Sequence, residues 1–308
     1  MSRGTWKRVS PALVSAAVLV WLLARVDLAA LAEAISWRIG AVIVLALLGY
    51  GAVSLLLESL SMTLLARLPR EELGAWTAAR LKCASYLLGI VNYALGAGAL
   101  AVLLRRHTRL SLGEAASLVL LISSADLVVV LGLAGAGVAL VETRAPTIAG
   151  AVAVAAIAFF GGLALLRMPT SLGPLERIRS LAVFQGLRTV PAQRIGALLA
   201  LRICFTGSFV ALFAASFYAF EVRVPPVVMA VGVLIVGVVA GVPIAVAGLG
   251  TSQAAFLFVF ADYAPQELLL AQSLVLSAGM LCLRGGMGLV FAREFTREAL
   301  RETQGAPT

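Results

Sequence analysis

The chain has 308 residues, of which 61% are hydrophobic and only 13% are charged. Water-soluble domains are about half apolar and about a quarter charged, so this composition excludes a water-soluble protein. The chain has a net charge of +9, but it lacks the water-exposed face through which a basic protein binds nucleic acid. The sequence predicts an all-α polytopic membrane protein. Its longest polar stretch, 167–194, is too short for a globular domain, so we expect a single transmembrane domain over residues 1–308.

Apolar segments follow one another along the whole chain. A transmembrane helix needs roughly 20 apolar residues. The segments that fit a single crossing lie at about 9–25, 39–66, 115–141, 146–166, 194–220 and 266–292. Two further regions, about 74–104 and about 225–262, are broken in the middle. The first is too long for one helix, and the second ends in a segment too short to cross alone.

Both broken regions carry residues that interrupt a helix. Hydrocarbon tolerates irregular backbone only where protein or trapped water satisfies the freed polar groups. Paired, interrupted segments are also the best pointer to a binding site in transporters. We therefore expect the functional part of the molecule at these breaks. The residues at the breaks are Asn92, Gly96, Gly98, Pro243, Gly248, Gly250 and Gln253.

The placement of Lys and Arg indicates how the broken regions lie in the membrane. If both are re-entrant hairpins, 16 of the 24 Lys and Arg residues fall in loops on the N-terminal side. The opposite side then holds only Arg25, Arg38, Arg144 and Arg223. The positive-inside rule thus predicts six spanning helices plus two re-entrant helical hairpins, with both termini cytoplasmic. The stretch 167–194 is either an interfacial amphipathic helix or a solvated linker.

Six ionisable side chains lie inside the apolar segments, where charges usually face a cavity or a partner. At ~1.5 Å of rise per residue they share one layer of the cytoplasmic half, about 9–17 Å deep. Four are basic and two are acidic, and a surplus of positive charge suits an anionic headgroup. The alternative is two structural ion pairs, with the two basic residues of 74–104 extending to the membrane surface. The six are Glu58, Arg80, Lys82, Asp126, Arg202 and Arg284.

With these residues in this order, the chain resembles the lysylphosphatidylglycerol synthase transmembrane-region family of flippase-like membrane proteins. The resemblance implies a multi-pass protein of the bacterial plasma membrane that moves or presents lipids. Relatives precede a soluble catalytic domain or accompany polyprenol-dependent glycosyltransferases. No basic residue stands near Asp126 in the sequence, and Ser252-Gln253 occupy positions that are charged in the family. The residues that carry the resemblance are Asn92, Gly96, Gly98, Gly113-Glu114, Asp126, Gly248-Leu249-Gly250 and Arg284-Gly285-Gly286.

Three functions follow as hypotheses. The first is a non-enzymatic protein that translocates or presents an anionic lipid or lipid-linked precursor, with Arg202 and Arg284 holding the headgroup and the breaks serving as gates. The second is a non-catalytic membrane partner of a glycosyltransferase or lipid synthase. The third is an intramembrane lipid-modifying transferase. It is disfavoured because Glu58 and Asp126 are the only carboxylates inside the apolar segments and the chain has one His. We expect membrane lipids as partners, no cofactor, no metal and no nucleic acid.

Overall fold

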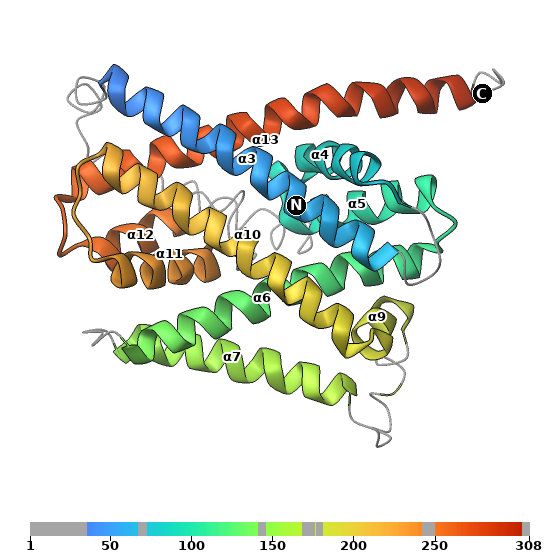
Figure 1. Ribbon diagram of the computed structural model, residues 1–308, viewed down its shortest axis with the longest axis horizontal. Coiled ribbons are helices and arrows are strands. Elements are labelled where there is room, and N and C mark those ends of the chain that lie inside the picture. Colours follow the sequence, from blue (N-terminus) through green and yellow to red (C-terminus); the bar gives the residue numbers. More distant parts are fainter. Residues whose placement is uncertain are drawn as a thin grey trace, which may run out of the picture. The chain divides into compact units, whose positions relative to one another are not determined.

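The structure, a computed structural model, describes residues 36–66, 73–140, 146–167, 176, 181–241 and 250–303. These residues form helices and no strand, as Figure 1 shows, which confirms the all-α prediction for this part of the chain. The predicted first span, 9–25, lies outside the described residues, as do Pro243 and Gly248. The helices are α3 (Trp37–Ala66), α4 (Ala75–Val91), α5 (Tyr93–His107), α6 (Leu112–Leu140), α7 (Pro146–Arg167), η2 (Ala182–Phe184), α9 (Gln185–Thr189), α10 (Ala192–Ala219), α11 (Pro226–Gly241), α12 (Thr251–Phe260) and α13 (Gln266–Thr303).

Four helices in the described part of the chain are long and apolar enough to cross a membrane. They are Trp37–Ala66, Leu112–Gly137, Ala192–Ala219 and Gln266–Phe291. Each coincides with a span predicted from the sequence, and α7 covers the predicted span at 146–166. The chain is therefore a multi-pass membrane protein. The count of six spans and the cytoplasmic termini remain predictions.

Local sequence explains where several helices begin and end. Ser111 and Glu114 form a capping box at the start of α6: the Ser111 amide donates to Glu114 Oε2 at 2.8 Å, and the Glu114 amide donates to Ser111 Oγ at 3.3 Å. Proline occupies the first position of α7 and of α11, where its missing N–H breaks no hydrogen bond. At the end of α10, Glu221 adopts φ 57° and the Val222 amide bonds back to the Phe217 carbonyl, as in a Schellman motif.

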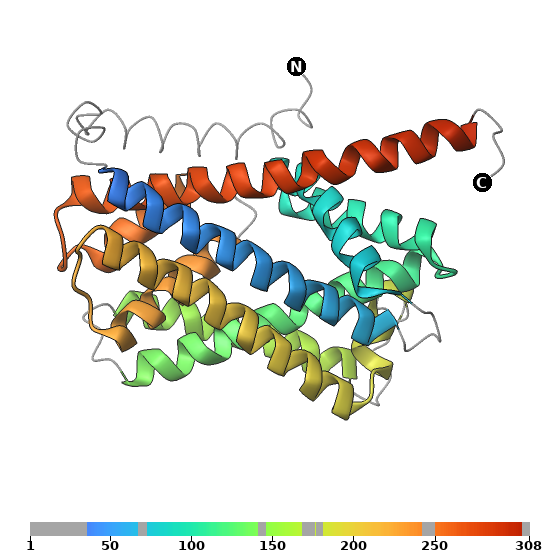
Figure 2. The same ribbon diagram turned by 45° about the horizontal axis from the view of Figure 1, so that its top comes forward.

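The two broken regions form pairs of short helices. Only Asn92 separates α4 from α5, and these helices, drawn in teal, lie side by side in Figures 1 and 2. In the second pair, Gly232 of α11 lies against Val259 and Phe260 of α12, so the two helices pack against each other. With 17 and 15 residues in the first pair and 16 and 10 in the second, each helix is shorter than a typical span. Their lengths fit the predicted re-entrant hairpins, whose placement in the membrane stays a prediction.

The chain divides into two compact units. Unit 1 comprises Met1–Gly51, Leu127–Phe159 and Thr206–Met280, and unit 2 comprises Ala52–Asp126, Phe160–Phe205 and Leu281–Thr308. Five helices, α3, α6, α7, α10 and α13, contribute residues to both units. Unit 1 contains the α11–α12 pair and unit 2 contains the α4–α5 pair.

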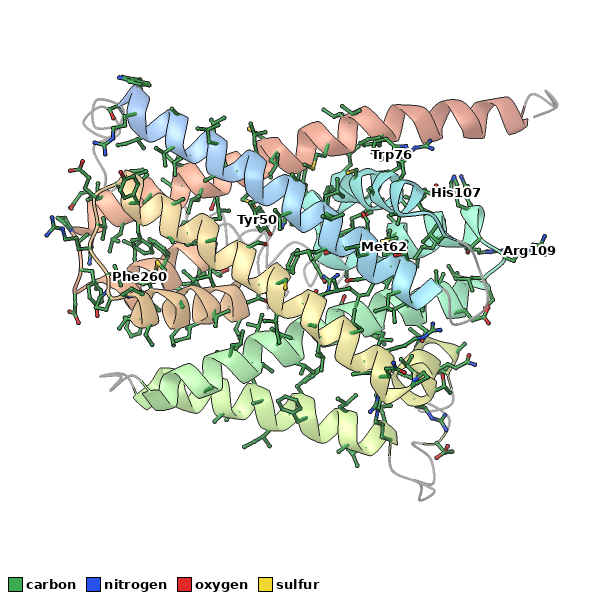
Figure 3. All side chains as sticks on the ribbon, in the orientation of Figure 1. Tyr50, Met62, Trp76, His107, Arg109 and Phe260 are labelled. Atoms are coloured by element: carbon green, nitrogen blue, oxygen red, sulfur yellow. The ribbon has the colours of Figure 1, made fainter. Side chains whose placement is uncertain are left out.

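Each unit has its own apolar core. In unit 1, Phe213 and Phe217 of α10 meet Phe256 and Phe260 of α12 with ring centroids 4.9–5.9 Å apart, a spacing at which aromatic rings attract each other. In unit 2, buried Leu, Ile, Ala and Met side chains of α3, α4, α5, α6 and α10 form one cluster. Met62 of α3, labelled in Figure 3, belongs to that core, whereas Trp76 near the start of α4 and His107 at the end of α5 are exposed.

Candidate functional site

Four ionisable side chains from four helices of unit 2 converge on one another. Glu58 comes from α3, Lys82 from α4, Asp126 from α6 and Arg202 from α10. Lys82 Nζ lies 3.0 Å from Glu58 Oε1. Arg202 Nη1 lies 3.5 Å from the same Glu58 oxygen and 3.3 Å from Asp126 Oδ1. The alternating chain of charges Lys82–Glu58–Arg202–Asp126, which we call the charge cluster, links the four helices.

The charge cluster is enclosed to different degrees along its length. The side chain of Arg202 is 0% exposed and that of Glu58 is 7% exposed, whereas Lys82 and Asp126 reach 18% and 27%. Arg202 Nη2 also donates to Ser61 Oγ at 2.5 Å. Two buried atoms, Glu58 Oε2 and Arg202 Nε, have no hydrogen-bond partner among the residues that the structure describes. An unsatisfied buried donor and acceptor in one group of charges is unusual and calls for an explanation.

The arrangement differs from the sequence-based hypotheses in one respect. One of them had Lys82 extending to the membrane surface, but its ammonium group is instead mostly buried and paired with Glu58. Burial of an ammonium is strongly unfavourable without a compensating anion, and Glu58 supplies it. With two acids and two bases the charge cluster is formally neutral, so the surplus positive charge of the predicted layer resides outside it.

The two remaining charges of the predicted layer lie outside the charge cluster. Arg284 of α13 is exposed, and its guanidinium carbon lies 5.8 Å from the centroid of the Tyr86 ring. Lys82 Nζ lies at the same distance, 5.8 Å, from that ring. Cations are attracted to aromatic faces within about 6 Å, so Tyr86 connects Arg284 with the charge cluster. Arg80 is half-buried on α4.

The basic partner of Asp126 comes from a distant part of the sequence. No Lys or Arg precedes it on α6, and Arg202 of α10, 76 residues away, donates to both of its carboxylate oxygens, at 3.3 and 3.5 Å. The charge compensation that the sequence lacks near Asp126 is therefore provided in space. Sequence reasoning also missed Ser61, although it lies three residues after Glu58 and thus on the same face of α3.

The break between α4 and α5 is built by Asn92. Its backbone is extended, and its side-chain oxygen accepts a hydrogen bond of 2.8 Å from the Ala94 amide, which caps the start of α5. Tyr93 Oη, the next side chain, lies 3.1 Å from Ser123 Oγ of α6. Gly96 is buried where α5 approaches α4: a Cβ there would lie 2.6 Å from Gly89 Cα. Gly98, by contrast, faces open space.

The start of α12 in unit 1 has comparable features. Gly250 adopts φ 93°, a conformation that L side chains rarely take. The buried Gln253 side chain accepts a hydrogen bond from the Gly250 amide at 2.5 Å and donates one to Ser277 Oγ at 2.9 Å. Gln253 thus ties the start of α12 to α13. Of the predicted residues of this break, Gly250 and Gln253 fall within the described part of the chain.

Unit 1 also has an orphaned amide that sequence reasoning missed. Gln272 of α13 is 0% exposed, and in the described part of the chain neither its nitrogen nor its oxygen has a hydrogen-bond partner. Leu269 and Leu276, one turn before and after it, belong to the apolar core. In the sequence, Gln272 is a single amide within an apolar span, and a search restricted to charged residues does not select it.

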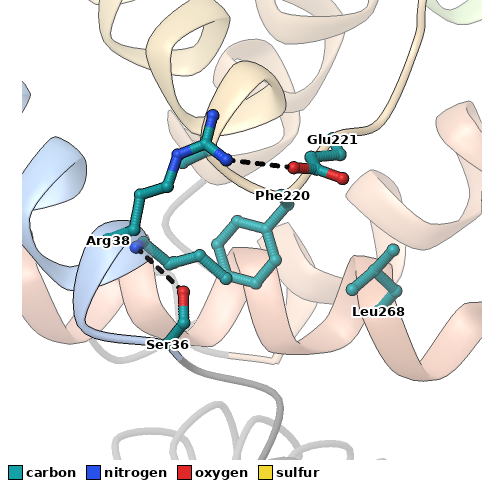
Figure 4. A pocket seen from close by; sticks show the side chains of 7 residues that line it. Ser36, Arg38, Phe220, Glu221 and Leu268 are labelled. Atoms are coloured by element: carbon teal, nitrogen blue, oxygen red, sulfur yellow. Dashed lines mark hydrogen bonds and ion pairs between the residues drawn. The ribbon is translucent and has the colours of Figure 1, made fainter.

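A shallow cavity of about 180 Å³ lies at the surface of unit 1, lined by Ser36, Arg38, Ile39, Ala219, Phe220, Glu221 and Leu268 (Figure 4). The Arg38–Glu221 ion pair of 3.3 Å that borders it is solvent-exposed on both sides, and exposed pairs of this kind contribute little. Within the described residues no group of three or more His, Cys, Asp or Glu side chains is placed to hold a metal ion.

Comparison with curated proteins found no match. The family model described as the lysylphosphatidylglycerol synthase TM region matches residues 9–281. That match covers most of the chain, including every residue of the charge cluster, and it ends within α13, before Arg284. The chain therefore belongs to the lysylphosphatidylglycerol synthase transmembrane-region family, as the order of its polar residues suggested.

Proposed function

We propose that this protein translocates or presents an anionic lipid, or an anionic lipid-linked precursor, in the bacterial plasma membrane, and that it does so without catalysis. Its family points to membrane lipid metabolism or transport. The observation that carries the proposal is the charge cluster, in which Glu58, Asp126 and Arg202 lie on helices long and apolar enough to cross a membrane. Ionisable groups inside a membrane are expensive to bury and mark substrate or ion pathways.

The accessible cation beside the charge cluster supports an anionic ligand. Arg284 is exposed, whereas Arg202 is fully enclosed by its carboxylate and hydroxyl partners. A guanidinium group binds phosphate through two parallel hydrogen bonds, so Arg284 is the residue we assign to the first contact with a headgroup. The Tyr86 ring lies next to both Arg284 and Lys82. It would therefore connect a headgroup bound at Arg284 with the charge cluster.

The α4–α5 pair supports a moving element beside this site. Its two helices are short, they meet at the single residue Asn92, and Lys82 of the charge cluster belongs to α4. In transporters, discontinuous helices surround the substrate site and supply the moving gates. We assign Asn92 and Gly96 to the hinge of such a gate. The sequence has no P-loop motif for ATP, so transport would be passive or coupled to an ion gradient.

A liposome assay with fluorescent lipids tests the proposal. Purified protein is reconstituted, and the movement of labelled phosphatidylglycerol between leaflets is compared with that of labelled phosphatidylcholine. Wild type is expected to accelerate the anionic lipid, and Arg284→Ala to slow it at least about tenfold, since a lost charged hydrogen bond is worth about 1.5–3 kcal/mol. Arg106→Ala, an exposed arginine at the end of α5, serves as the matched control and should be unaffected.

Two outcomes would overturn the proposal. Equal scrambling by Arg284→Ala and Arg106→Ala would remove Arg284 from the site. No scrambling by wild type, combined with co-purification of a glycosyltransferase or lipid synthase, would favour the alternative function as a membrane partner of such an enzyme.

A further inference from the structure

We propose that Asp126 is an internal counter-anion that competes with the phosphate group of the ligand for Arg202. In this inference, which rests on the proposed function, an anionic headgroup enters by exchange: its phosphate takes the place of the Asp126 carboxylate, and the carboxylate returns when the ligand leaves. The shared chemistry is that of a phosphate monoanion, whether it belongs to a lipid or is free in solution.

Exposure identifies Asp126 as the member of the charge cluster that a ligand would meet. The Arg202 side chain is 0% exposed, whereas that of its partner Asp126 is 27% exposed. Glu58, the other carboxylate on Arg202, is 7% exposed. A ligand approaching Arg202 from the accessible side of the pair therefore reaches the Asp126 carboxylate first.

The hydrogen bonds identify the same residue as the more easily displaced one. Glu58 is held by Lys82 at 3.0 Å and by Arg202 at 3.5 Å. Within the described part of the chain, the polar contacts of Asp126 all go to one atom, Arg202 Nη1, at 3.3 and 3.5 Å. Hydrogen bonds between a guanidinium and a carboxylate are typically about 2.7–2.9 Å long, so Asp126 is loosely held by comparison.

Within the charge cluster itself, the charge balance favours an exchange over an addition. The groups that surround Asp126 are Arg202 from α10, Glu58 from α3 and Lys82 from α4, and with Asp126 they sum to zero. A phosphate added to this set would leave one uncompensated negative charge in a buried place, which is strongly unfavourable. If Asp126 leaves as the phosphate enters, the set stays neutral.

Arg202 has unused binding capacity for the incoming group. Its Nε is buried and donates no hydrogen bond to any described residue, while Nη1 and Nη2 are used. A guanidinium offers five N–H donors, and a phosphate offers more acceptor oxygens than a carboxylate. The orphaned donor is thus an independent sign that the site is incomplete without a ligand.

The test measures binding to purified full-length protein in detergent. The probes are short-chain phosphatidylglycerol, short-chain phosphatidylcholine and inorganic phosphate. The change is Asp126→Asn, which keeps the shape and an acceptor oxygen while removing the charge. Glu114→Gln removes a carboxylate charge from the same helix twelve residues earlier, about 18 Å away, and is the matched control because, among the described residues, Glu114 hydrogen-bonds to Ser111 alone. Asp126→Glu, which restores the charge, completes the set.

Asp126→Asn is expected to bind short-chain phosphatidylglycerol at least about tenfold more tightly than wild type, the low end of the coupling measured for close charge pairs. The same variant should scramble phosphatidylglycerol more slowly, because no carboxylate returns to displace the bound anion. Glu114→Gln and Asp126→Glu should bind like wild type. If inorganic phosphate gains as much affinity as the lipid, exchange at Arg202 is supported and the lipid specificity of the proposed function is refuted.

Unchanged or weaker binding by Asp126→Asn, with binding intact in wild type, would overturn the counter-anion role and leave the proposed function standing. Loss of binding in every protein, wild type included, would overturn both. Should Asp126→Asn fail to fold by size-exclusion chromatography, Asp126→Ser gives the same test with a hydroxyl acceptor in place of the carboxylate.

Discussion

The α4–α5 pair depends on the missing side chain at Gly96. In Gly96→Ala the new Cβ would lie 2.6 Å from Gly89 Cα and 2.9 Å from Gly89 N. Carbon atoms in contact are about 3.5–4.0 Å apart, so the two helix backbones must separate by roughly 1 Å. Such overpacking costs about 1–3 kcal/mol, while alanine favours a helix over glycine by about 1 kcal/mol. The expected net loss of stability is therefore up to about 2 kcal/mol.

Gly98→Ala is the matched control for this prediction. It lies one half-turn further along α5, it is exposed, and a Cβ there would meet nothing within 4 Å. Only the helix propensity acts at this position, so Gly98→Ala should gain up to about 1 kcal/mol. Two substitutions of the same chemistry, two residues apart, are thus expected to change stability in opposite directions.

A buried cysteine provides the assay. Cys83 on α4 is buried, whereas Cys204 and Cys282 are exposed. In a Cys204→Ser/Cys282→Ser background, a thiol-reactive dye reports only on exposure of Cys83, and its labelling is followed while the protein is heated in detergent. Gly96→Ala should be labelled at a lower temperature than the parent and Gly98→Ala at a higher one. If Gly96→Ala melts at or above the parent temperature, the close approach of the two helices is refuted.

Three further predictions concern buried or strained groups. Gln272→Leu should raise the melting temperature, because an unsatisfied buried polar group costs about 1–3 kcal/mol and Gln272 has no partner among the described residues. A lower melting temperature would show that the amide does have a hydrogen-bond partner. Glu221→Gly should stabilise the protein by up to about 1 kcal/mol in chemical denaturation by relieving the left-handed backbone at φ 57°, whereas Glu221→Ala, which removes only the ion pair with Arg38, should not. Arg202→Ala should lose about 3–5 kcal/mol of stability and yield little folded protein on size-exclusion chromatography. Adding Asp126→Ala to this variant should recover part of the lost stability. A fully stable Arg202→Ala variant would contradict the proposed role of Arg202 in the charge cluster.

The fold could be predicted to the level of helices because composition and segment length determine them. The stretch 74–104 was too long for one helix, and the structure divides it at Asn92, the polar residue whose side chain caps the second helix. The different roles of Gly96 and Gly98 could not be predicted. Both residues weaken a helix equally, and only the rotation of α5 against α4 decides which of them faces Gly89.

The charge cluster shows the same limit. Depth along each helix could be counted, and it placed Glu58, Lys82, Asp126 and Arg202 in one layer. The pairing of these charges could not be predicted, because it depends on the direction in which each side chain leaves its helix and on which helices are neighbours. The side chain of Lys82 is long enough to reach a membrane surface. Its ammonium group instead lies 3.0 Å from Glu58, a contact that the sequence alone does not show.

Helix α13 continues well past the apolar part of its sequence. The span ends at Phe291, but the helix runs to Thr303, so its last twelve residues extend about 18 Å further at ~1.5 Å each. A straight helix acts as a lever arm: Thr303 lies 19 residues, or about 28 Å, beyond Arg284, so each 10° of tilt about Arg284 would displace the far end by about 5 Å. Any adjustment of α13 to a bound headgroup is thereby amplified at a position where a spectroscopic label, or another protein, could detect it.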